Sequence, residues 1–487
     1  MIKKNIRVRF APSPTGYLHV GGLRTALYNY LFAKKNNGTF ILRIEDTDRN
    51  RFVEGAVDNL IAALKWCELE FDEGPNIEGN FGPYMQSQRL ELYKKYSEEL
   101  LNSGHAYYCF CTPERLDALR EQQQKQKLPQ SKYDKHCLHL TPEEIKHNLD
   151  SGLQYVVRLN VPPDMQITFD DLIREEVTFN SSNIDDQILI KGDGYPTYHL
   201  ANVIDDHLME ITHVIRGEEW LSSTPKHILL YNFFGWEKPL FAHLPLLLNP
   251  DRSKLSKRQG DVAVEDYRAK GYLREALVNF VALLGWNAGD DKEFYDMDSL
   301  IENFSLERVN KAGAVFDLEK LNWLNTEHLR KKDDKEILSM LKEEINHSSF
   351  NLNNYTDDYL LKVITAMKER VSFIREYLTK SPYFFEAPVE YDRSSIEKNW
   401  KEETALQMDK LNDAFTLIDN PTKEEFEIVL TKIAGELNIG KGKLIHPLRL
   451  AVSGMSSGPG VFDILSIIGK DETLKRIKTA INNIKLK

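Results

Sequence analysis

The sequence predicts an α/β fold: a doubly wound domain at the N-terminus followed by an all-helical C-terminal half. The first hundred residues alternate between strand-like and helix-like segments, and the pattern beyond about residue 262 is almost wholly helical. A chain of 487 residues also exceeds the size of one ordinary core, so we expect two or more domains.

The N-terminal segments follow the order strand, loop, helix, strand. Residues 6–10 alternate apolar and polar side chains, and the prolines and glycine of residues 11–16 can continue neither a strand nor a helix. Residues 23–31 carry apolar side chains at helical spacing, and Asn-Asn-Gly at 36–38 is typical of a helix end. Residues 39–44 form a short apolar run typical of a buried parallel strand. This βαβ unit is the basis of the doubly wound assignment.

The middle of the chain is predicted to hold an insertion, over residues 86–200. It contains a Gln/Lys-rich stretch at 121–135, which we interpret as a loop or surface helix, and β-like residues at 155–161. A second α/β stretch follows, with strand-like residues at 213–217 and 244–248. The helical half begins after it, with the clearest helical periodicity in residues 333–345, 356–378 and 423–437.

Composition favours a globular, cytoplasmic protein. Hydrophobic residues make up 41% and charged residues 28%, and no apolar run approaches a membrane span. The N-terminal MIKKNIRVRF lacks the apolar region of a signal peptide. The net charge of −11 argues weakly against nucleic-acid binding, although a basic face can lie on an acidic protein. The four cysteines do not form a disulfide framework, and Cys67 is expected to be a buried small hydrophobe.

A glycine-containing turn, residues 14–22, joins the first strand to the first helix. Glycine lets a backbone approach a ligand closely, and a helix N-terminus offers free N–H groups and a positive dipole end to a phosphate. His19 would lie beside that end and can donate to a phosphate oxygen. The alternative is a tight turn in which the histidine only caps the helix.

A cluster of cations lies at residues 252–258, in a turn-rich context. Such a segment suits a loop that closes over a polyphosphate and stabilises charge in the transition state. The alternative is an exposed basic loop. A third phosphate motif is rejected: residues 435–442 begin like a P-loop, but Gly442 stands where Ser or Thr must bind Mg²⁺, and a helix rather than a strand precedes it.

Cys109, Cys111, Cys137 and His139 have the ligand types of a closed tetrahedral Zn²⁺ site. The C-x-C spacing is tighter than usual, so the motif alone is moderately specific. Because protein would fill all four positions, the predicted role is structural. The alternative is scattered cysteines with a surface histidine.

Together the glycine-containing turn at residues 14–22 and the cation cluster at residues 252–258 resemble the HIGH and KMSKS motifs of class I aminoacyl-tRNA synthetases. Gly22 replaces the second histidine of the first motif, a replacement typical of the glutamyl and glutaminyl branch. Longer matches resemble bacterial glutamyl-tRNA synthetases and span nearly the whole chain: residues 7–16, 43–48, 193–202, 216–220, 316–321 and 457–465.

The resemblance implies a Rossmann-type catalytic domain with an acceptor-binding insertion, and a helical anticodon-binding half. The expected domains are 1–85 and 201–250 for the two catalytic halves, 86–200 for the insertion with its zinc module, 251–335 for a stem-contact helical domain with the KLSKR loop, and 336–487 for the anticodon-binding domain. The implied activity is ligation of glutamate to tRNA(Glu) through a glutamyl-adenylate made with ATP.

The resemblance also assigns the site residues. His19 and Lys257 carry the catalytic roles, with Mg²⁺ expected alongside ATP. The ATP-binding residues are Pro12, Ser13, Pro14, Thr15, Gly16, His19, Gly21, Gly22, Lys254, Leu255, Ser256, Lys257 and Arg258. The glutamate-binding residues are Arg9, Ala11, Ser13, Glu45, Tyr198, Asn202 and Arg216. The two arginines suit this role because a buried substrate carboxylate needs a paired cation, and arginine offers a planar fork of donors. Some members of the family bind zinc in the insertion that meets the tRNA acceptor end.

The expected partners are tRNA(Glu), glutamate and ATP, with no membrane contact, and the enzyme is expected to be a monomer. A glutaminyl-tRNA synthetase is the nearest rival, but its anticodon half is a β-barrel. A shortened paralogue that modifies a tRNA base lacks the C-terminal half. A non-catalytic tRNA-binding relic would have lost the phosphate motifs, and a simple nucleotidylyltransferase would not need an anticodon domain. The sequence leaves open whether tRNA(Gln) is also charged.

Overall fold

The computed structural model describes residues 5–77, 79–128, 131–255 and 263–485. Two compact units make up the chain. Unit 1 comprises Met1–Lys270 and Arg274–Leu318, and unit 2 comprises Gly271–Leu273 and Glu319–Lys487. The finer domain boundaries expected from the sequence stay a prediction.

Unit 1 opens with the predicted βαβ unit. Strand β1 (Arg7–Phe10) pairs in parallel with β2 (Thr39–Leu42), and helix α1 (Val20–Lys35) connects them. All four residues of β1 are buried, and α1 buries one face that includes Leu23 and Leu27. The helix ends at Lys35 with Asn36, the first residue of the predicted stop, as its C-cap.

The second half of the doubly wound domain places another parallel pair beside β1. Strand β8 (His213–Gly217) pairs in parallel with β9 (Leu240–Leu244), which sets Arg216 opposite His243. The backbone N–H of Thr212 donates to the carbonyl of Arg7 at 2.9 Å, so β8 begins beside the start of β1. In folds of this kind ligands bind at the carboxyl ends of such strands, where the connections diverge.

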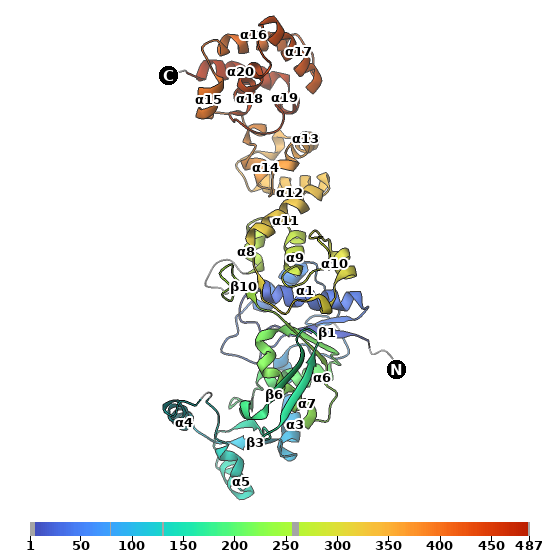
Figure 1. The fold of residues 1–487 in the computed structure, drawn as a ribbon, viewed down its shortest axis with the longest axis vertical. Coiled ribbons are helices and arrows are strands. Elements are labelled where there is room, and N and C mark those ends of the chain that lie inside the picture. Colours follow the sequence, from blue (N-terminus) through green and yellow to red (C-terminus); the bar gives the residue numbers. More distant parts are fainter. Residues whose placement is uncertain (1–4, 78, 129–130, 256–262, 486–487) are drawn as a thin grey trace. The chain divides into compact units, whose positions relative to one another are not determined.

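Strands from the predicted insertion extend this sheet. β5 (Gln166–Asp171) runs parallel to β9 with Asp171 opposite Phe241, and β6 (Glu175–Asn180) pairs antiparallel with β5. The resulting order is β6-β5-β9-β8. Helices α6 (Tyr198–Leu208) and α7 (Thr224–Phe233) accompany it, and Figure 1 draws them next to these strands.

The rest of the predicted insertion forms a smaller antiparallel sheet with peripheral helices. Its strand order is β3-β4-β7, and α3 packs against β3. Helices α4 and α5 bury no residue, so the Gln/Lys-rich tract is a surface helix, as predicted, over its first part. The bounds are α3 Leu90–Asn102, β3 Ala106–Cys109, α4 Pro113–Lys125, α5 Pro142–Asp150, β4 Val156–Leu159 and β7 Ile188–Ile190.

One apolar core joins the insertion to the doubly wound sheet. Ile41 of β2, Tyr93 of α3, Leu189 of β7 and Leu229 of α7 belong to the same buried cluster. Burial of such a side chain contributes about 1.5–3 kcal/mol, so the small sheet is held firmly against the larger one. The other elements of unit 1 are α2 Ala56–Trp66, β10 Leu247–Leu248, α8 Val264–Ala269, α9 Arg274–Ala282, α10 Met297–Asn303 and β11 Ala314–Val315.

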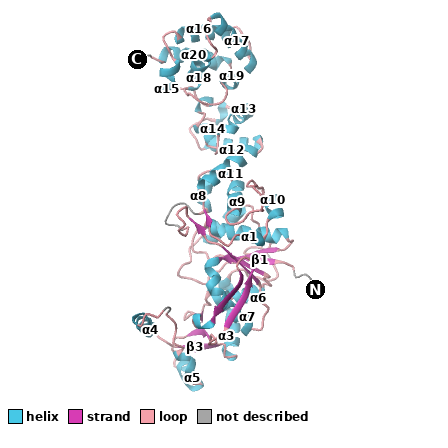
Figure 2. Cartoon of the chain, viewed as in Figure 1, coloured by secondary structure: helices cyan, strands magenta, loops and turns pink. Residues whose placement is uncertain are grey.

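Unit 2 is helical throughout the part that the structure describes, which confirms the predicted helical half (Figure 2). Its sequence supplies the helix starts: Thr422 caps α17 and forms a capping box with Glu425. The bounds are α11 Leu318–Lys331, α12 Asp334–Asn346, α13 Asp357–Met367, α14 Glu376–Thr379, α15 Arg393–Asn399, α16 Thr404–Thr416, α17 Lys423–Glu436, α18 Gly442–Ser453, α19 Val461–Ile468 and α20 Lys470–Asn483.

Two smaller sequence predictions are also confirmed. Residues 435–442 run from the last turn of α17 to the first residue of α18, so a helix rather than a strand precedes the connection and the P-loop is excluded. Cys67 is 1% exposed and packs as a small apolar side chain. Among the described residues, none of the helices has the length and apolar character that crossing a membrane requires.

Candidate active site

A cavity of about 350 Å³ lies at the carboxyl ends of β1 and β8. Its lining includes most of the residues predicted to bind ATP and glutamate: Arg9, Ala11, Pro12, Ser13, Thr15, Gly16, His19, Gly21, Gly22, Glu45, Tyr198 and Arg216. The fold therefore brings together segments that lie more than 200 residues apart in the sequence. Glu219 and Trp220 also line it; both lie in the matched segment 216–220, but the sequence assigned neither of them a role.

The glycine-containing turn forms the N-terminal end of α1, on one side of this cavity. His19 is the N-cap, and its Nδ1 accepts a hydrogen bond from the backbone N–H of Gly21 at 2.9 Å. A side chain at Gly22 would place its Cβ 3.0 Å from Cδ1 of Leu18. The alternative, in which His19 caps the helix, is therefore present, and the phosphate-binding role of its imidazole stays a prediction.

The predicted KLSKR segment is described only in part. Lys254 and Leu255 are placed, and the N–H of Leu255 donates to the carbonyl of Leu247 at 2.9 Å. Ser256, Lys257 and Arg258 lie outside the described residues. Where the chain is described again, Ala263 forms a bridge with His19, and the N–H of Val264 donates to the carbonyl of Leu18 at 2.9 Å. Ala263 and Val264, where the description of the chain resumes, thus meet the N-terminus of α1.

A buried ion-pair network forms a second side of the site. Arg9 donates through Nε and Nη2 to the two oxygens of Asp206, at 3.0 and 3.2 Å. Arg43, which is fully buried, donates to Asp206 at 2.7 Å and to Glu45 at 3.0 Å. Burial raises the pKa of Glu45 to about 7, although Arg43 and Arg9 oppose that shift. The sequence assigned Arg43 no role in the site, although Arg43 lies in the matched segment 43–48.

Arg216 has a different environment from these arginines. It is 4% exposed, and its hydrogen bonds within the described residues go to the neutral side chains of His243, Tyr198, Thr224 and His227. Asn202, also predicted for this pocket, donates to the Tyr198 hydroxyl at 3.3 Å. A desolvated guanidinium that lines a cavity and has no ion-pair partner among the described residues is suited to bind an anion.

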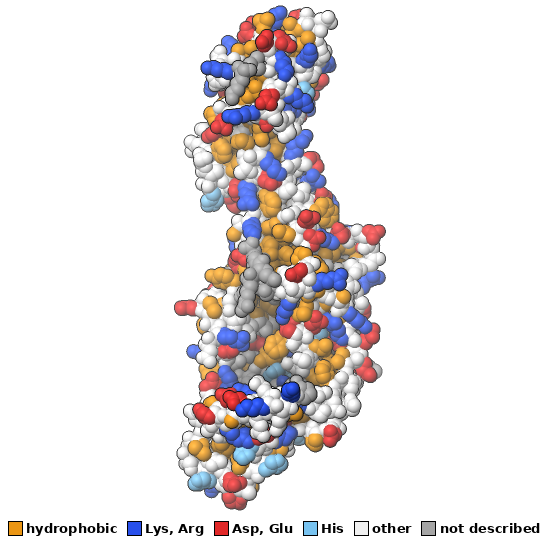
Figure 3. Space-filling view, turned by 60° about the vertical axis from the view of Figure 1, so that its left-hand side comes forward, with side chains coloured by type: hydrophobic (Ala, Val, Ile, Leu, Met, Phe, Trp, Pro, Cys, Tyr) orange, Lys and Arg blue, Asp and Glu red, His pale blue; other side chains and the backbone are white. Residues whose placement is uncertain are grey.

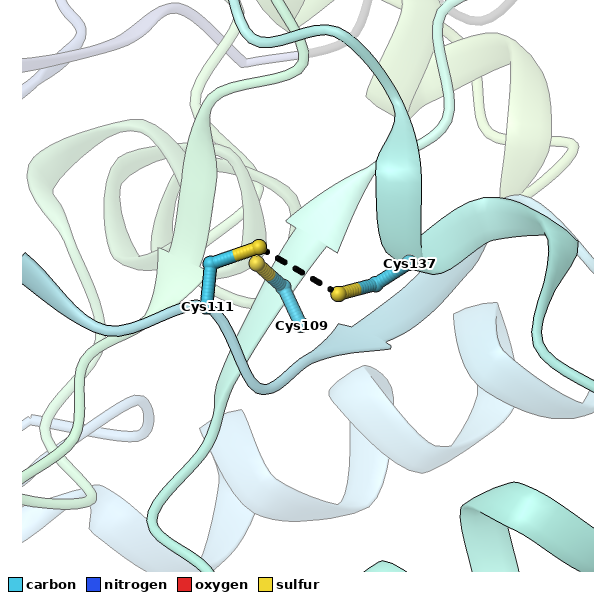
Figure 4. A group of neighbouring side chains, drawn as sticks. All are labelled: Cys109, Cys111 and Cys137. Atoms are coloured by element: carbon cyan, nitrogen blue, oxygen red, sulfur yellow. Dashed lines mark hydrogen bonds between the residues drawn. The ribbon is translucent and has the colours of Figure 1, made fainter. Parts of the chain in front are cut away.

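Three cysteines converge beside β3, away from the cavity. The Sγ atoms of Cys109, Cys111 and Cys137 lie within 4.8 Å of one another, and their side chains point together in Figure 4. The Sγ atoms of Cys111 and Cys137 are 3.5 Å apart. His139 is exposed and is not a member of this group, so its predicted role as a ligand stays a prediction.

Tyr133 is an unpredicted neighbour of the three cysteines. Its hydroxyl lies 3.4 Å from Sγ of Cys109 and 3.2 Å from Sγ of Cys111, and it accepts the backbone N–H of Cys137 at 3.0 Å. Arg158 stacks on its ring at 4.1 Å. A hydrogen bond from Cys137, with others from Tyr133 and Arg158, lowers the pKa of Cys109 to about 4 against the effect of burial. The thiolate is the form that binds metals.

A second, polar groove of about 520 Å³ adjoins the cavity. It shares Tyr198 and Trp220 with the cavity. Arg120, Lys132, Arg158 and Lys226 supply four cations to its lining. Gln187 also lines it and is 9% exposed, yet neither its buried Nε2 nor its Oε1 has a hydrogen-bond partner among the described residues.

Comparison with known families accounts for nearly the whole chain. The family model of the catalytic domain of class I tRNA synthetases for Glu and Gln matches residues 5–323. The model of an anticodon binding domain matches residues 325–481.

Individual relatives agree with this match. The glutamate–tRNA ligase of Chloroherpeton thalassium is 54% identical over 501 residues, with 99% of each chain covered. That of Chlorobaculum parvum is 51% identical, with 100% of this chain and 99% of the relative covered. The crystal structure of a glutamate tRNA ligase from Elizabethkingia meningosepticum, in complex with its amino acid, superimposes with a TM-score of 0.94 at 41% identity and covers 99% of this chain and 100% of that one.

Proposed function

The chain belongs to the family of class I glutamate–tRNA ligases, and we propose that the cavity of unit 1 is where glutamate and ATP react. In the first step an oxygen of the glutamate α-carboxylate attacks the α-phosphorus of ATP, and pyrophosphate leaves. In the second step the terminal ribose hydroxyl of tRNA(Glu) attacks the carbonyl carbon of glutamyl-adenylate, and AMP leaves. Neither step needs a nucleophile from the protein, which contributes by orienting reactants and stabilising charge.

Arg216 carries the assignment of the amino-acid subsite. Its buried guanidinium lines the cavity, and its hydrogen-bond partners among the described residues are neutral side chains. The side-chain carboxylate of glutamate would supply the missing negative charge. Glutamine has nearly the same shape but an uncharged amide, so it would leave this cation desolvated and uncompensated.

The other end of glutamate would be held by the ion-pair network. Glu45 lies in the cavity and offers a carboxylate to the substrate ammonium, while Arg9 would face the α-carboxylate. Ala11, Ser13, Tyr198 and Asn202 would complete the pocket. Arg9 already uses its Nε and Nη2 atoms on Asp206, so its contribution to the substrate comes from the remaining Nη1 donors.

ATP would bind with its phosphates at the N-terminus of α1. The turn from Pro12 to Gly22 offers backbone N–H groups and His19 there, and the helix dipole favours negative charge. Lys254 and the segment that continues to Lys257 and Arg258 would cover the phosphates from the other side. Mg²⁺ is expected to accompany ATP and to neutralise part of its charge.

A structural zinc ion fits the cysteine cluster of the insertion. Three cysteine side chains converge, and hydrogen bonds from Cys137, Tyr133 and Arg158 lower the pKa of Cys109. The sequence predicts His139 as the fourth ligand, whereas the contacts of the Tyr133 hydroxyl with two of the thiols favour Tyr133. In either arrangement protein fills all four positions and the ion would brace the insertion.

The polar groove is suited to the acceptor end of tRNA(Glu), because the four cations of its lining outnumber its one carboxylate, Asp185, and because it adjoins the cavity at Tyr198 and Trp220. The helical unit 2 would carry the anticodon contacts. On the face drawn in Figure 3, Lys and Arg side chains are interspersed with acidic ones. As an enzyme of translation it would act in the cytoplasm, and we keep the expectation of a monomer.

The function is tested by aminoacylation of purified tRNA(Glu) and tRNA(Gln), each offered glutamate and glutamine. We expect charging of tRNA(Glu) with glutamate only, and the tRNA(Gln) reactions report whether that tRNA is also a substrate.

The assignment of Arg216 is tested with Arg216→Gln in the same assay with tRNA(Glu). We expect a large loss of kcat/KM for glutamate and a much smaller change in residual use of glutamine. An equal loss for both amino acids would move the charge-reading role to another residue.

A further inference from the structure

Arg216 is held by side chains from three other elements, namely Tyr198 of α6, Thr224 and His227 of α7, and His243 of β9. Its Nε donates to Nε2 of His243 at 3.1 Å, and its Nη2 donates to Thr224 at 2.9 Å. Both Nη atoms lie 3.3 Å from Nδ1 of His227. Because a guanidinium only donates, each imidazole nitrogen that faces it must be an unprotonated acceptor.

This requirement fixes the proton on His243. Its Nε2 accepts from Arg216, so the proton is on Nδ1, which lies 2.6 Å from Oδ2 of Asp171. Asp171 is 3% exposed, and its Oδ1 accepts the backbone N–H groups of Ile173 and Arg174 at 3.0 and 2.9 Å. Burial lowers the pKa of His243 to about 4, so the imidazole is neutral at physiological pH.

The same reasoning fixes His227. Its Nδ1 faces the guanidinium, so its proton is on Nε2, which lies 3.1 Å from Nδ1 of His199. Burial lowers the pKa of His227 well below its usual value, and Arg216 adds to that effect. Arg216 therefore has neutral acceptors around it, and the carboxylate of Asp171 is one imidazole away.

We propose that Asp171 and His243 are positioning residues that fix Arg216 in the orientation that selects a substrate carboxylate over an amide. This inference rests on the proposed role of Arg216. A carboxylate in direct contact with Arg216 would neutralise the cation and compete with the substrate. Asp171 instead holds His243 in one tautomer, and His243 holds the guanidinium through Nε while leaving its charge available.

Asp171→Asn should reverse the tautomer of His243 while keeping the shape of the side chain at position 171. The amide oxygen would keep the bonds from the backbone N–H groups of Ile173 and Arg174, so the NH₂ group would face Nδ1 of His243. The imidazole would then carry its proton on Nε2, where that proton opposes the Nε–H of Arg216. We expect KM for glutamate to rise about 10- to 100-fold, the range typical of lost supporting contacts. KM for ATP and residual use of glutamine should change little.

Two substitutions of His243 form a matched pair. A glutamine amide reaches the position of Nε2, so His243→Gln keeps an acceptor for Arg216. An asparagine amide reaches only the position of Nδ1, so His243→Asn keeps the contact with Asp171 and loses the contact with Arg216. Both introduce an amide at the same buried site. We expect His243→Asn to lower the preference for glutamate over glutamine about tenfold or more, and His243→Gln to retain most of it.

The decisive experiment is a double-mutant cycle of Asp171→Asn and Arg216→Gln, with kcat and KM measured for glutamate, glutamine and ATP in the presence of tRNA(Glu). If Asp171 acts through Arg216, its substitution should not alter the glutamate-to-glutamine preference further when Arg216 is already glutamine. The inference would be overturned if Asp171→Asn and His243→Asn kept the wild-type preference for glutamate over glutamine while Arg216→Gln lost it. That result would leave the proposed function standing. An unchanged preference in Arg216→Gln alone would overturn both. Should Asp171→Asn fail to fold, the two His243 variants decide the question by the same measurement.

Discussion

Arg43 and Glu45 form a buried ion pair in which Nη2 of Arg43 donates to Oε1 of Glu45 at 3.0 Å. Arg43 also lies 2.7 Å from Asp206 and 3.9 Å from Asp205, which pair in addition with Arg9 and Arg89, so Glu45 shares its cation with two other carboxylates. Glu45 is therefore only partly compensated. Its burial raises its pKa to about 7, which leaves this carboxylate ready to gain from a second cation in the cavity.

Glutamate binding should depend on this ionisation. Below about pH 7 Glu45 is increasingly protonated in the free enzyme and loses the charge that would pair with the substrate ammonium. Binding of the ammonium favours the carboxylate form and lowers its pKa, so affinity should rise with pH and level off above about 7. Because one proton is linked to binding, KM for glutamate should fall about tenfold per pH unit on the acid side. Measurement of KM from pH 5.5 to 8.5 checks this.

Glu45→Gln provides the control for that profile. The variant should bind glutamate weakly at every pH, with the acid-side slope removed. If the wild-type slope persists in Glu45→Gln, another group is responsible for it.

His19 can be separated from its capping role. His19→Ala removes both the N-cap and the imidazole, so it should lower the stability of the protein by about 1 kcal/mol as well as its activity. Asparagine is a strong N-cap residue, so His19→Asn should keep wild-type stability while adenylate formation falls about 10²–10³-fold. Thermal unfolding and pyrophosphate exchange with tRNA present measure the two effects. Full activity in His19→Asn would show that His19 acts only as the N-cap of α1.

Lys257→Ala should reduce adenylate formation to a similar extent, about 10²–10³-fold, because it removes a charge opposite the transferring phosphate. Lys254→Ala, which removes the same charge three residues earlier, is the matched comparison and should have the smaller effect. Pyrophosphate exchange in the presence of tRNA measures both. Near-normal activation by Lys257→Ala would count decisively against its catalytic role.

The sequence predicted local structure and motif residues better than the contacts that support them. The βαβ unit and the helical half could be predicted because apolar periodicity is a local property, visible around Leu23 or in residues 423–437. His243 could not be connected to Arg216, because their contact depends on the register of β8 against β9. The histidine inside the apolar strand Leu240–Leu244 was the available signal, since a polar side chain in a buried strand needs a partner. Tyr133 carried no such signal, because tyrosine is uncommon in zinc-ligand patterns.

One zinc ion per chain is expected in protein purified without added metal. Cys111→Ser should lose most of it, because Cys111 is one of the three converging thiols. Cys67→Ser makes the same chemical change at a buried cysteine outside the group, and its zinc content should equal that of the wild type. Elemental analysis measures the metal. A metal-free preparation with full activity would contradict the site.

Tyr133→Phe and His139→Ala distinguish the two candidates for the fourth ligand. We expect zinc retention against a chelator to fall more in Tyr133→Phe, because the hydroxyl of Tyr133 lies within 3.4 Å of two thiols while His139 is exposed. Competition with a chromogenic chelator gives the relative affinities. The reverse order would assign the position to His139, as the sequence predicts.

Acid should destabilise unit 1 through its buried histidines. Burial lowers the pKa of His243 to about 4 and that of His199 to about 3, against 6.5 in the unfolded chain. Between these values the unfolded state binds more protons, so the stability is fully present above about pH 6.5 and is lost as the pH falls toward 4. Unfolding by urea at pH 7.5, 6.0 and 5.0 measures the loss. His243→Gln has one titrating group fewer, and its stability should fall less over the same range.

The polar groove should contribute to tRNA binding and should not contribute to glutamate activation. Arg120 and Lys132 line it beside Gln187, whose buried amide has no partner among the described residues and is suited to the edge of a nucleobase. Arg120→Ala should raise KM for tRNA several-fold and should reduce the slope of log affinity against log salt by about 0.7, the value for one single-strand phosphate contact. Lys125→Ala removes the same charge from the same helix, α4, outside the groove lining, and its KM and slope should match the wild type. KM values for ATP and glutamate should be unchanged in both variants. Equal effects of the two substitutions would mean that the net charge of α4, rather than the groove, attracts the tRNA.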